Sequence, residues 1–185
     1  MIYLIRHGES VANAGERVED HKTAPLSEKG FEQARVFATG FNEKPDLIVY
    51  SPFLRAEQTA QPFIDKFSDV PVEVWDVQEF TFLSDDRYRG TTVVERRILS
   101  KEYYSRNDLD YACGKGAESF NQMLKRVHGI MEKLQKLDKD KNIVIFTHGR
   151  FMRACLMVIN NLPISIESFL SLKPIDNLEV VKFEL

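Results

Sequence analysis

Apolar residues along this chain gather in short runs that have the composition of β-strands. The runs are rich in β-branched and aromatic residues, and they predict strands at Ile2–Ile5, Leu47–Tyr50, Val70–Trp75 and Ile143–Phe146. A later run predicts an antiparallel edge strand at Leu178–Phe183. Short, continuous apolar runs are typical of strands that are buried on both faces of a sheet.

Longer segments between these runs carry apolar residues at helical spacing. They predict helices at Ser27–Phe41, Arg55–Phe67 and Glu118–Leu137, and another helix after His148. Ser27 is the expected cap of its helix, and one face is expected to hold Phe31, Ala34, Phe37 and Ala38. Strands that alternate with helices predict an α/β fold, a three-layer α/β/α sandwich with a mostly parallel central sheet.

Residues 81–106 fit neither the strand period nor the helix period well. We interpret them as an excursion from the sheet, partly helical, that walls a site. The excursion carries Arg87, Arg89, Arg96 and Arg97, either as a solvated face or as contacts to a second phosphate or carboxylate. A chain of 185 residues otherwise predicts one domain spanning 1–185.

The overall charge restricts the partners. A net charge of −3 and a pI near 5.9 argue against a nucleic-acid-binding protein, which would usually be basic. No apolar stretch approaches the length of a transmembrane helix, so no membrane partner is expected. Cys113 and Cys155 lack a metal-ligand spacing and are expected to be free thiols in a cytoplasmic protein.

The dipeptide His-Gly follows an expected strand twice, in "YLIRHGES" and in "NIVIFTHGR". Parallel strands end on a common edge of a sheet, and ligands bind outside those ends. We therefore expect His7 and His148 to converge on one pocket. The remaining histidines, His21 and His128, have no such context and are assigned no role.

Two arginines complete a cationic pocket on an otherwise acidic protein. Arg6 directly precedes His7, and Arg55 stands near the first turn of a helix, where backbone N–H groups favour an anion. Guanidinium groups pair with phosphate oxygens through two parallel hydrogen bonds, so the pocket suits a phosphoryl group. A metal is not expected, because Arg6 would oppose a divalent cation and no HExxH spacing occurs.

Five segments in this order resemble the histidine phosphatase superfamily, also called phosphoglycerate-mutase-like. They are "LIRHGES" with Asn13, "PLSEKGFEQA", "SPFLRAEQTA", "GAESF" and "THGRFMR". The resemblance implies that His7 is a nucleophile that forms a phosphohistidine, without any cofactor or metal. It also implies that Arg6, Arg55 and His148 hold the transferred phosphoryl oxygens and that Asn13 donates a further hydrogen bond.

The resemblance implies a carboxylic acid that protonates the leaving group, and "VWDVQEFTF" offers Glu79. Burial beside Phe80 and Phe82, together with repulsion from the substrate phosphate, would favour its protonated form. Asp76 and Asp85 are rival candidates. Glu118 in "GAESF" lies near the site or simply begins a helix.

The activity expected from these residues is metal-independent hydrolysis of a small phosphorylated metabolite. A phosphoglycerate mutase, a phosphoprotein phosphatase and a non-catalytic binding module are the alternatives. Mutases of this family are longer, with extra covering segments, which favours the phosphatase. Where many relatives have a second glycine after the late His-Gly, this chain has Arg150, either as an anion contact at the pocket mouth or as a solvated side chain. The physiological substrate and the oligomeric state stay open.

Overall fold

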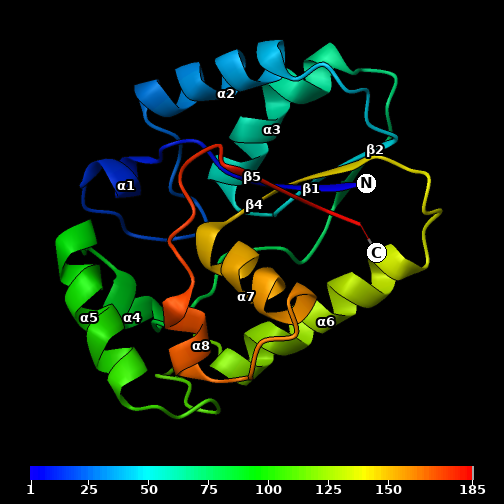
Figure 1. Ribbon diagram of the computed structural model, residues 1–185. Helices are drawn as coiled ribbons and strands as arrows, with labels where there is room; N and C mark the ends of the chain where they lie inside the picture. The colour runs from blue at the N-terminus through cyan, green and yellow to red at the C-terminus, as the bar shows by residue number, and fades with distance from the viewer. Residues whose placement is uncertain (185) are drawn as a thin grey trace.

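A computed structural model describes residues 1–184 and shows a five-stranded sheet between layers of helices (Figure 1). The strands are β1 (Ile2–Arg6), β2 (Leu47–Tyr50), β3 (Val72–Val74), β4 (Ile143–Thr147) and β5 (Val180–Phe183). Their order across the sheet is β3-β2-β4-β1-β5. The first four strands pair in parallel and β5 runs antiparallel to β1, which confirms the predicted α/β fold with an antiparallel edge.

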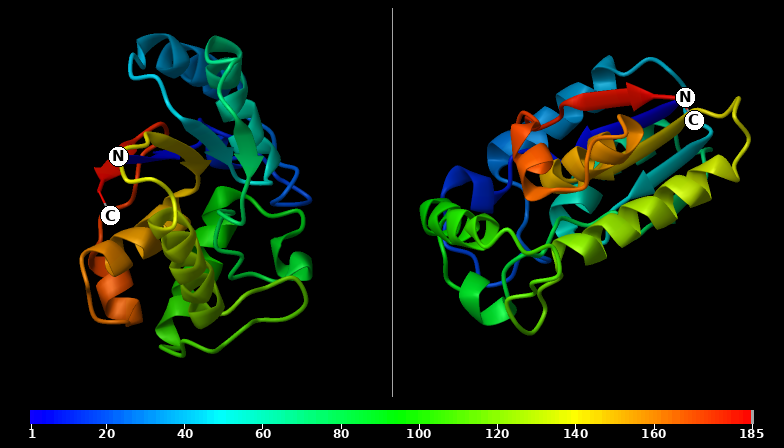
Figure 2. Two further views of the ribbon diagram at one scale, coloured as in Figure 1. Left: turned by 90° about the vertical axis from the view of Figure 1, so that its right-hand side faces the viewer. Right: turned by 60° about the horizontal axis from the view of Figure 1, so that its bottom comes forward.

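Helices cover both faces of the sheet. They are α1 (Val11–Ala14), α2 (Glu28–Gly40), α3 (Leu54–Lys66), α4 (Asp85–Tyr88), α5 (Val93–Ser105), α6 (Phe120–Gln135), α7 (Gly149–Ile159) and α8 (Ile166–Ser171). Figure 2 shows α2 and α3 on one face and α6 and α7 on the other. Among residues 1–184, no helix has both the length and the apolar character needed to cross a membrane.

The alternation of side chains along β1 divides the core into two parts. Tyr3 and Ile5 pack with Phe63 of α3 in one cluster, whereas Leu4 packs with Met123 of α6 in the other. Each of these side chains is buried, because successive residues of a strand face opposite sides of the sheet. Because helices cover both faces of the sheet, these strands appear in the sequence as continuous apolar runs.

The expected helices and strands are present, with some corrected boundaries. The long helix begins at Phe120 rather than Glu118, because Ser119 accepts the hydrogen bond that caps it. The third strand shrinks from Val70–Trp75 to β3, an exposed edge strand. The last strand begins only at Val180, after Leu178 adopts a φ of 60°.

The face predicted for the first long helix is not buried along its whole length. Ser27 caps α2 as expected, and Ala34 and Ala38 are buried. Phe31, however, is 39% exposed. It lies in the first turn, where α2 meets α3 rather than the sheet, and lines a shallow groove with Leu54. Helical spacing does not show how far a helix extends beyond the layer that it covers.

A close backbone approach joins α2 to the loop that follows β1. A Cβ atom added at Gly30 would lie only 1.9 Å from the carbonyl oxygen of Glu9, so only glycine fits there. The same carbonyl accepts a hydrogen bond from the backbone N–H of Ser27 over 2.9 Å. The segment "PLSEKG" therefore holds in place the loop that carries His7 and Gly8.

Candidate active site

Two histidines meet at the carboxyl end of the sheet. Strands β1 and β4 are parallel neighbours with Arg6 opposite Thr147, so the residues that follow them leave the sheet side by side. These residues are His7 and His148, and their ring centroids lie 5.0 Å apart. Both side chains are buried. The expectation that the two His-Gly sequences converge is confirmed.

The hydrogen bonds of His7 define its tautomer. Nδ1 lies 2.6 Å from the carbonyl oxygen of Gly8, and Nε2 lies 3.0 Å from Nε of Arg55. Because a guanidinium nitrogen can only donate, Nε2 must accept, and the ring proton resides on Nδ1. Burial, followed by the charges of Arg55 and Arg6, holds the pKa of His7 well below its usual value of about 6.5. His7 is therefore a neutral imidazole at neutral pH.

Arg55 is fixed by groups that are distant in the sequence. Its Nη1 donates to the carbonyl oxygen of His21 over 2.5 Å. Its own carbonyl accepts from the hydroxyl of Thr59 over 2.6 Å, and that hydroxyl oxygen accepts from the backbone N–H of Gly8 over 3.0 Å. Burial lowers the pKa of Arg55 to about 10, so it remains a cation at neutral pH. His21 and Thr59 thus join the site, although the sequence pattern did not single them out.

His148 is completely buried and is not one of the residues that line the cavity beside His7. Its Nε2 lies 2.7 Å from Oγ of Ser51, which follows β2 on the same edge of the sheet. Burial and the charge of Arg55 hold the pKa of His148 well below its usual value. Nδ1 of His148 and Nε of Arg6 are both buried without a hydrogen-bond partner in the described part of the chain. These two nitrogens therefore have hydrogen-bonding capacity that the described residues do not use.

The side chain of Glu79 lies against the first turn of α7. Its Oε1 accepts hydrogen bonds from the backbone N–H groups of Arg150 and Phe151, at 3.1 and 3.3 Å, and from that of Phe80 at 3.0 Å. Its Oε2 lies 3.9 Å from Nη1 of Arg150, and the side chain lines the same cavity as His7. Among residues 1–184, Oε2 accepts no hydrogen bond.

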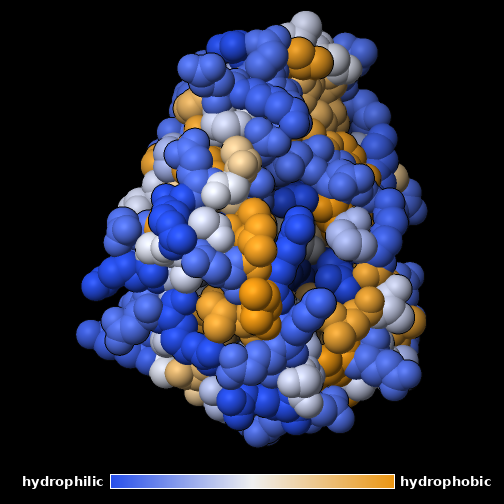
Figure 3. All heavy atoms as spheres, turned by 90° about the vertical axis from the view of Figure 1, so that its left-hand side faces the viewer, coloured by the Kyte–Doolittle hydropathy of each residue, from blue (hydrophilic) through white to orange (hydrophobic). Residues whose placement is uncertain are grey.

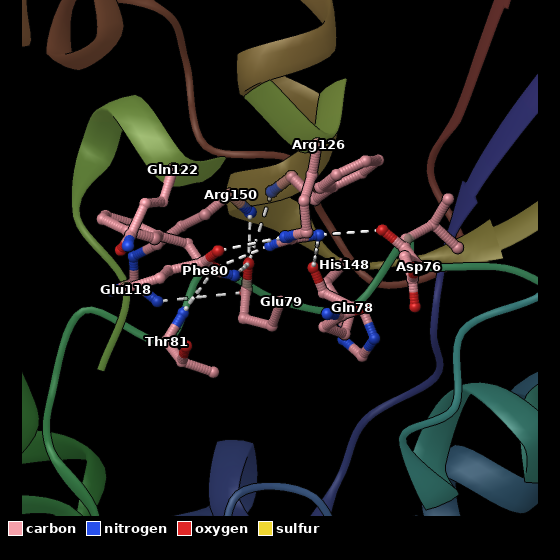
Figure 4. A network of polar contacts seen from close by, with 12 residues as sticks. Asp76, Gln78, Glu79, Phe80, Thr81, Glu118, Gln122, Arg126, His148 and Arg150 are labelled. Atoms are coloured by element: carbon pink, nitrogen blue, oxygen red, sulfur yellow. Dashed lines mark hydrogen bonds and ion pairs between the residues drawn. The ribbon is translucent and has the colours of Figure 1, made fainter. Parts of the chain in front are cut away.

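An ion pair supports the segment that carries Glu79 (Figure 4). Arg126 of α6 forms two hydrogen bonds to the carboxylate of Glu118, at 3.0 and 2.6 Å. Its Nη1 also donates to the carbonyl oxygens of Asp76 and Gln78. Glu118 in turn accepts the backbone N–H of Thr81 over 3.2 Å. The pair therefore contacts the backbone before and after Glu79. Glu118 thus supports the segment that carries Glu79 in addition to standing near the start of a helix.

Asn13 lies on α1 at the cavity wall, and its side chain serves two purposes. Its Oδ1 accepts hydrogen bonds from the backbone N–H and the hydroxyl of Ser10, at 3.2 and 3.0 Å. These bonds orient the amide so that its NH₂ group is left for other partners. Asn13 lines the same cavity as His7.

A cavity of about 450 Å³ connects these residues. Arg6, His7, Asn13, Arg55 and Glu79 all line it. Residues of the excursion form much of its wall, including Thr81, Phe82, Leu83, Tyr88, Val93, Arg96 and Arg97. Figure 3 faces the side of the molecule on which the strands end, and it shows a hollow among hydrophilic and apolar side chains. The excursion thus walls the site, and α5 lies beyond the strand ends (Figure 1).

The residues of the site do not form a metal-binding set. Within residues 1–184, no three His, Cys, Asp or Glu side chains gather in a way that could hold a metal ion.

Asp76 and Asp85, the rival candidates for the acid, do not line the cavity. The carboxylate at the site is that of Glu79.

Comparisons with known proteins agree with this geometry. A metal-independent phosphoserine phosphatase of Arabidopsis thaliana is 31% identical over 163 residues, which cover 85% of this chain and 68% of that protein. A probable phosphoglycerate mutase of Yersinia pestis is 26% identical over 183 residues, 93% of this chain and 80% of that protein. The solved structure of the α-ribazole phosphatase of Shigella flexneri matches with a TM-score of 0.75 and 26% identity, over 95% of this chain and 86% of that one.

A family model gives the same result over almost the whole chain. The model described as the histidine phosphatase superfamily (branch 1) matches residues 2–185. Its match includes both His-Gly sequences, Arg55 and Glu79. The chain therefore belongs to the histidine phosphatase superfamily, branch 1, and is a phosphatase of that type.

Proposed function

We propose that this protein hydrolyses phosphate monoesters of small metabolites through a phosphohistidine at His7, without a metal ion. The observation that carries the proposal is the state of His7. Its ring is neutral, its proton is held on Nδ1 by Gly8, and its Nε2 accepts a hydrogen bond from Arg55 at the wall of a cavity that Arg6 also lines. A neutral imidazole beside fixed cations is suited to attack a phosphoryl group.

In the first step, Nε2 of His7 attacks phosphorus and the bond from phosphorus to the ester oxygen breaks. Arg55 then donates to a phosphoryl oxygen instead of to Nε2, and Arg6 and Asn13 contribute further donors. The hydrogen bond from Nδ1 to Gly8 stabilises the positive charge that the ring gains. Glu79 donates a proton to the leaving alkoxide, so that an alcohol departs.

In the second step, a water molecule attacks phosphorus and the bond from Nε2 to phosphorus breaks. Glu79, now a carboxylate, accepts the proton of the attacking water. Inorganic phosphate leaves and His7 returns to its neutral form. A single carboxyl group thus serves both half-reactions, as an acid and then as a base.

We assign His148 a role in holding the phosphoryl group. Oγ of Ser51 already accepts the backbone N–H of Phe53, and we assign its hydroxyl proton to the 2.7 Å contact with Nε2 of His148. The proton of the His148 ring is then on Nδ1, the buried atom that lacks a protein partner. A phosphoryl oxygen bound beside His7 would accept this hydrogen bond.

The cavity wall favours a small substrate over a phosphoprotein. The excursion from Thr81 to Arg97 closes one side of the cavity, which leaves about 450 Å³. This volume lies within the range typical of sites for small molecules. The relative from Arabidopsis is named for a small phosphomonoester, phosphoserine, which supports the same substrate class.

Single-turnover labelling with a generic phosphomonoester tests the proposal. We expect wild-type protein to form an acid-labile phosphoenzyme with and without a chelator, and His7→Ala to form none. Circular dichroism would show whether His7→Ala retains the fold. Loss of labelling in the chelator, or failure of the wild type to label with any ester, would contradict the proposed chemistry.

A further inference from the structure

The direction of the His7 ring depends on Gly8, the residue that follows it. A Cβ atom at Gly8 would lie 2.8 Å from the carbonyl oxygen of Gly30, so a larger residue would require a shift of backbone. Glycine constrains its own backbone less than any other residue does. Gly8 nevertheless supplies the carbonyl oxygen that lies 2.6 Å from Nδ1 of His7. Contacts from elsewhere must therefore fix the peptide groups on both sides of Gly8.

Side chains from three separate segments hold these two peptide groups. In the peptide between His7 and Gly8, the N–H donates to the hydroxyl of Thr59 over 3.0 Å. The carbonyl oxygen of that peptide accepts from Nδ2 of Asn177 over 2.7 Å. In the next peptide, the N–H donates to Oε1 of Gln33 over 2.8 Å, and the carbonyl oxygen is the partner of the His7 ring. Every polar group of the two peptides is thus in contact with a partner.

Asn177 comes from the far end of the chain. It lies in the segment that runs from α8 to the start of β5 (Figure 1). Because β5 is antiparallel to β1, with Val180 opposite Ile5, this segment passes the end of β1 where Arg6 and His7 leave the sheet. Asn177 is not one of the residues that line the cavity, so its contact is with the nucleophile and not with a ligand.

The same segment also holds Arg6. The backbone N–H of Arg6 donates to the carbonyl oxygen of Glu179 over 3.2 Å, and its carbonyl oxygen accepts from the N–H of Leu178 over 3.0 Å. Nη1 of the Arg6 guanidinium donates to the carbonyl oxygen of Ile175 over 2.6 Å. One segment therefore orients both the guanidinium of Arg6 and the peptide of His7.

This segment has a strained turn that its own contacts maintain. Leu178 has a φ of 60°, which residues other than glycine rarely adopt. The turn is closed by the N–H of Glu179, which donates to the carbonyl oxygen of Asp176 over 3.0 Å. The carboxylate of Glu179 accepts the N–H of Asp176 and pairs with Lys173, each at 2.8 Å. Strain of this kind persists only where surrounding contacts determine the conformation, and it is concentrated at functional sites.

We propose that Asn177 is a positioning residue for the nucleophile, and that the turn at Leu178 directs its amide to the carbonyl oxygen of His7. The inference rests on the proposed phosphatase function. A carbonyl oxygen can only accept, so the amide presents its NH₂ group. This bond keeps the Gly8 carbonyl beside Nδ1, which leaves the lone pair for attack on Nε2. Without the bond the peptide can rotate, and both tautomers of the ring become accessible.

The tautomer of His7 provides a test that needs no turnover. In the wild type, nitrogen NMR of the ring should show a protonated Nδ1 and an unprotonated Nε2 at neutral pH. Asn177→Ala should move both nitrogen shifts toward those of mixed tautomers. Asn160→Ala is the matched control, because Nδ2 of Asn160 also donates to a backbone carbonyl oxygen, that of Leu156, over 2.9 Å at the exposed end of α7. The control should leave the His7 shifts unchanged.

Single-turnover kinetics test whether this positioning affects the chemical step. With 4-nitrophenyl phosphate, Asn177→Ala should lower the rate constant of phosphoenzyme formation by about five- to tenfold, the scale of one hydrogen bond. The ester concentration at half-maximal rate should stay close to the wild-type value. A merely structural role would instead lower the labelled fraction with the folded fraction and leave the rate constant unchanged. Asn160→Ala should keep the wild-type rate constant.

Asn177→Asp covers the case in which Asn177→Ala does not fold. Aspartate has nearly the same size and is favoured in turns, but its carboxylate has no proton to donate to the carbonyl oxygen of His7. It should slow phosphoenzyme formation at least as much as Asn177→Ala. Circular dichroism shows which variant is folded. Wild-type ring shifts or a wild-type rate constant in that variant would overturn the inference.

The two measurements separate this inference from the proposed function. If the wild type forms no phosphoenzyme with any ester but Asn177→Ala changes the His7 tautomer, the hydrolytic function fails and the positioning role stands. If the wild type forms the phosphoenzyme and Asn177→Ala matches it in both ring shifts and rate constant, the positioning role fails and the function stands.

Discussion

Nε of Arg55 donates a hydrogen bond to Nε2 of His7 over 3.0 Å, so a permanent cation covers the lone pair that would attack phosphorus. The contact keeps the ring neutral and fixes its direction. A phosphoryl group that reaches His7 must take the place of this hydrogen bond, and its oxygens would then accept from the same Arg55. The residue that shields the nucleophile thus becomes a contact of the transferred group.

Replacing Arg55 with methionine should raise the pKa of His7. Burial and then the charge of Arg55 keep this pKa well below 6.5 in the wild type. The imidazole of His7 therefore stays uncharged as the pH falls into the acidic range. Without the cation the pKa shifts upward, and the fraction of neutral His7 begins to fall at a higher pH. NMR titration of the His7 ring measures the shift directly. An unchanged or lower pKa in Arg55→Met would contradict the electrostatic explanation.

Glu79→Gln should slow phosphoenzyme formation most for esters with poor leaving groups. Glutamine keeps an oxygen for the backbone N–H groups of Phe80, Arg150 and Phe151, but it has no proton to donate. We expect single-turnover rates to fall by about 10²- to 10⁴-fold with an alkyl phosphate. With 4-nitrophenyl phosphate the loss should be much smaller, because that leaving group departs without a proton. Equal losses with both esters would argue against proton donation by Glu79.

Arg126→Met should reproduce the leaving-group effect of Glu79→Gln in weaker form. The substitution removes the contacts to Glu118, Asp76 and Gln78 and leaves a partly buried carboxylate unpaired. We expect about 1–3 kcal/mol less free energy of unfolding. We also expect a larger loss with the alkyl ester than with the aryl ester, because Glu79 loses its support.

A purely structural role for Arg126 would give a different result. The two esters would then lose activity equally, in proportion to the folded fraction. Arg35→Met provides the matched control, since Arg35 pairs with Glu32 on the solvent side of α2 and both side chains are more than half exposed. That variant should preserve both the stability and the ester ratio.

Gly30→Ala should destabilise the fold strongly. Its Cβ would lie 1.9 Å from the carbonyl oxygen of Glu9, and a backbone atom cannot turn aside as a flexible side chain can. We expect a loss of about 1–3 kcal/mol or more in urea unfolding. Gly129→Ala is the matched control, because a Cβ at that position in α6 meets no atom within 4 Å. It should stabilise the protein by about 0.5–1 kcal/mol. Equal effects of the two substitutions would contradict the close approach of Gly30 to Glu9.

Local sequence patterns were sufficient to predict the layers of this fold. The apolar runs at Ile2–Ile5 and Ile143–Phe146 are strands because both faces of the sheet are covered, which requires continuous apolar side chains. Ser27 caps α2 because a hydroxyl that accepts a backbone N–H is a local property of the chain. The pairing of His7 with His148 could also be inferred, since parallel strands end on one edge.

The supporting contacts could not be predicted in the same way. Ser51 reaches His148, and Thr59 joins Gly8 to Arg55, only because separate strands and helices pack at one edge. Arg126 occupies a polar position of an amphipathic helix. Its spacing in the sequence is the same as that of a solvent-exposed residue. Its partners come from other segments of the chain, and no local spacing identifies them.

The sequence by itself determined the α/β layers, the strands that end in His-Gly and the cationic set around His7, because these depend on periodicity and on residues adjacent to strand ends. Tertiary structure decided the protonation state of His7, the placement of Glu79 and the gathering of six arginines around one cavity. The physical reason is that burial and charge proximity depend on contacts between residues that are distant in the sequence, and packing alone creates those contacts.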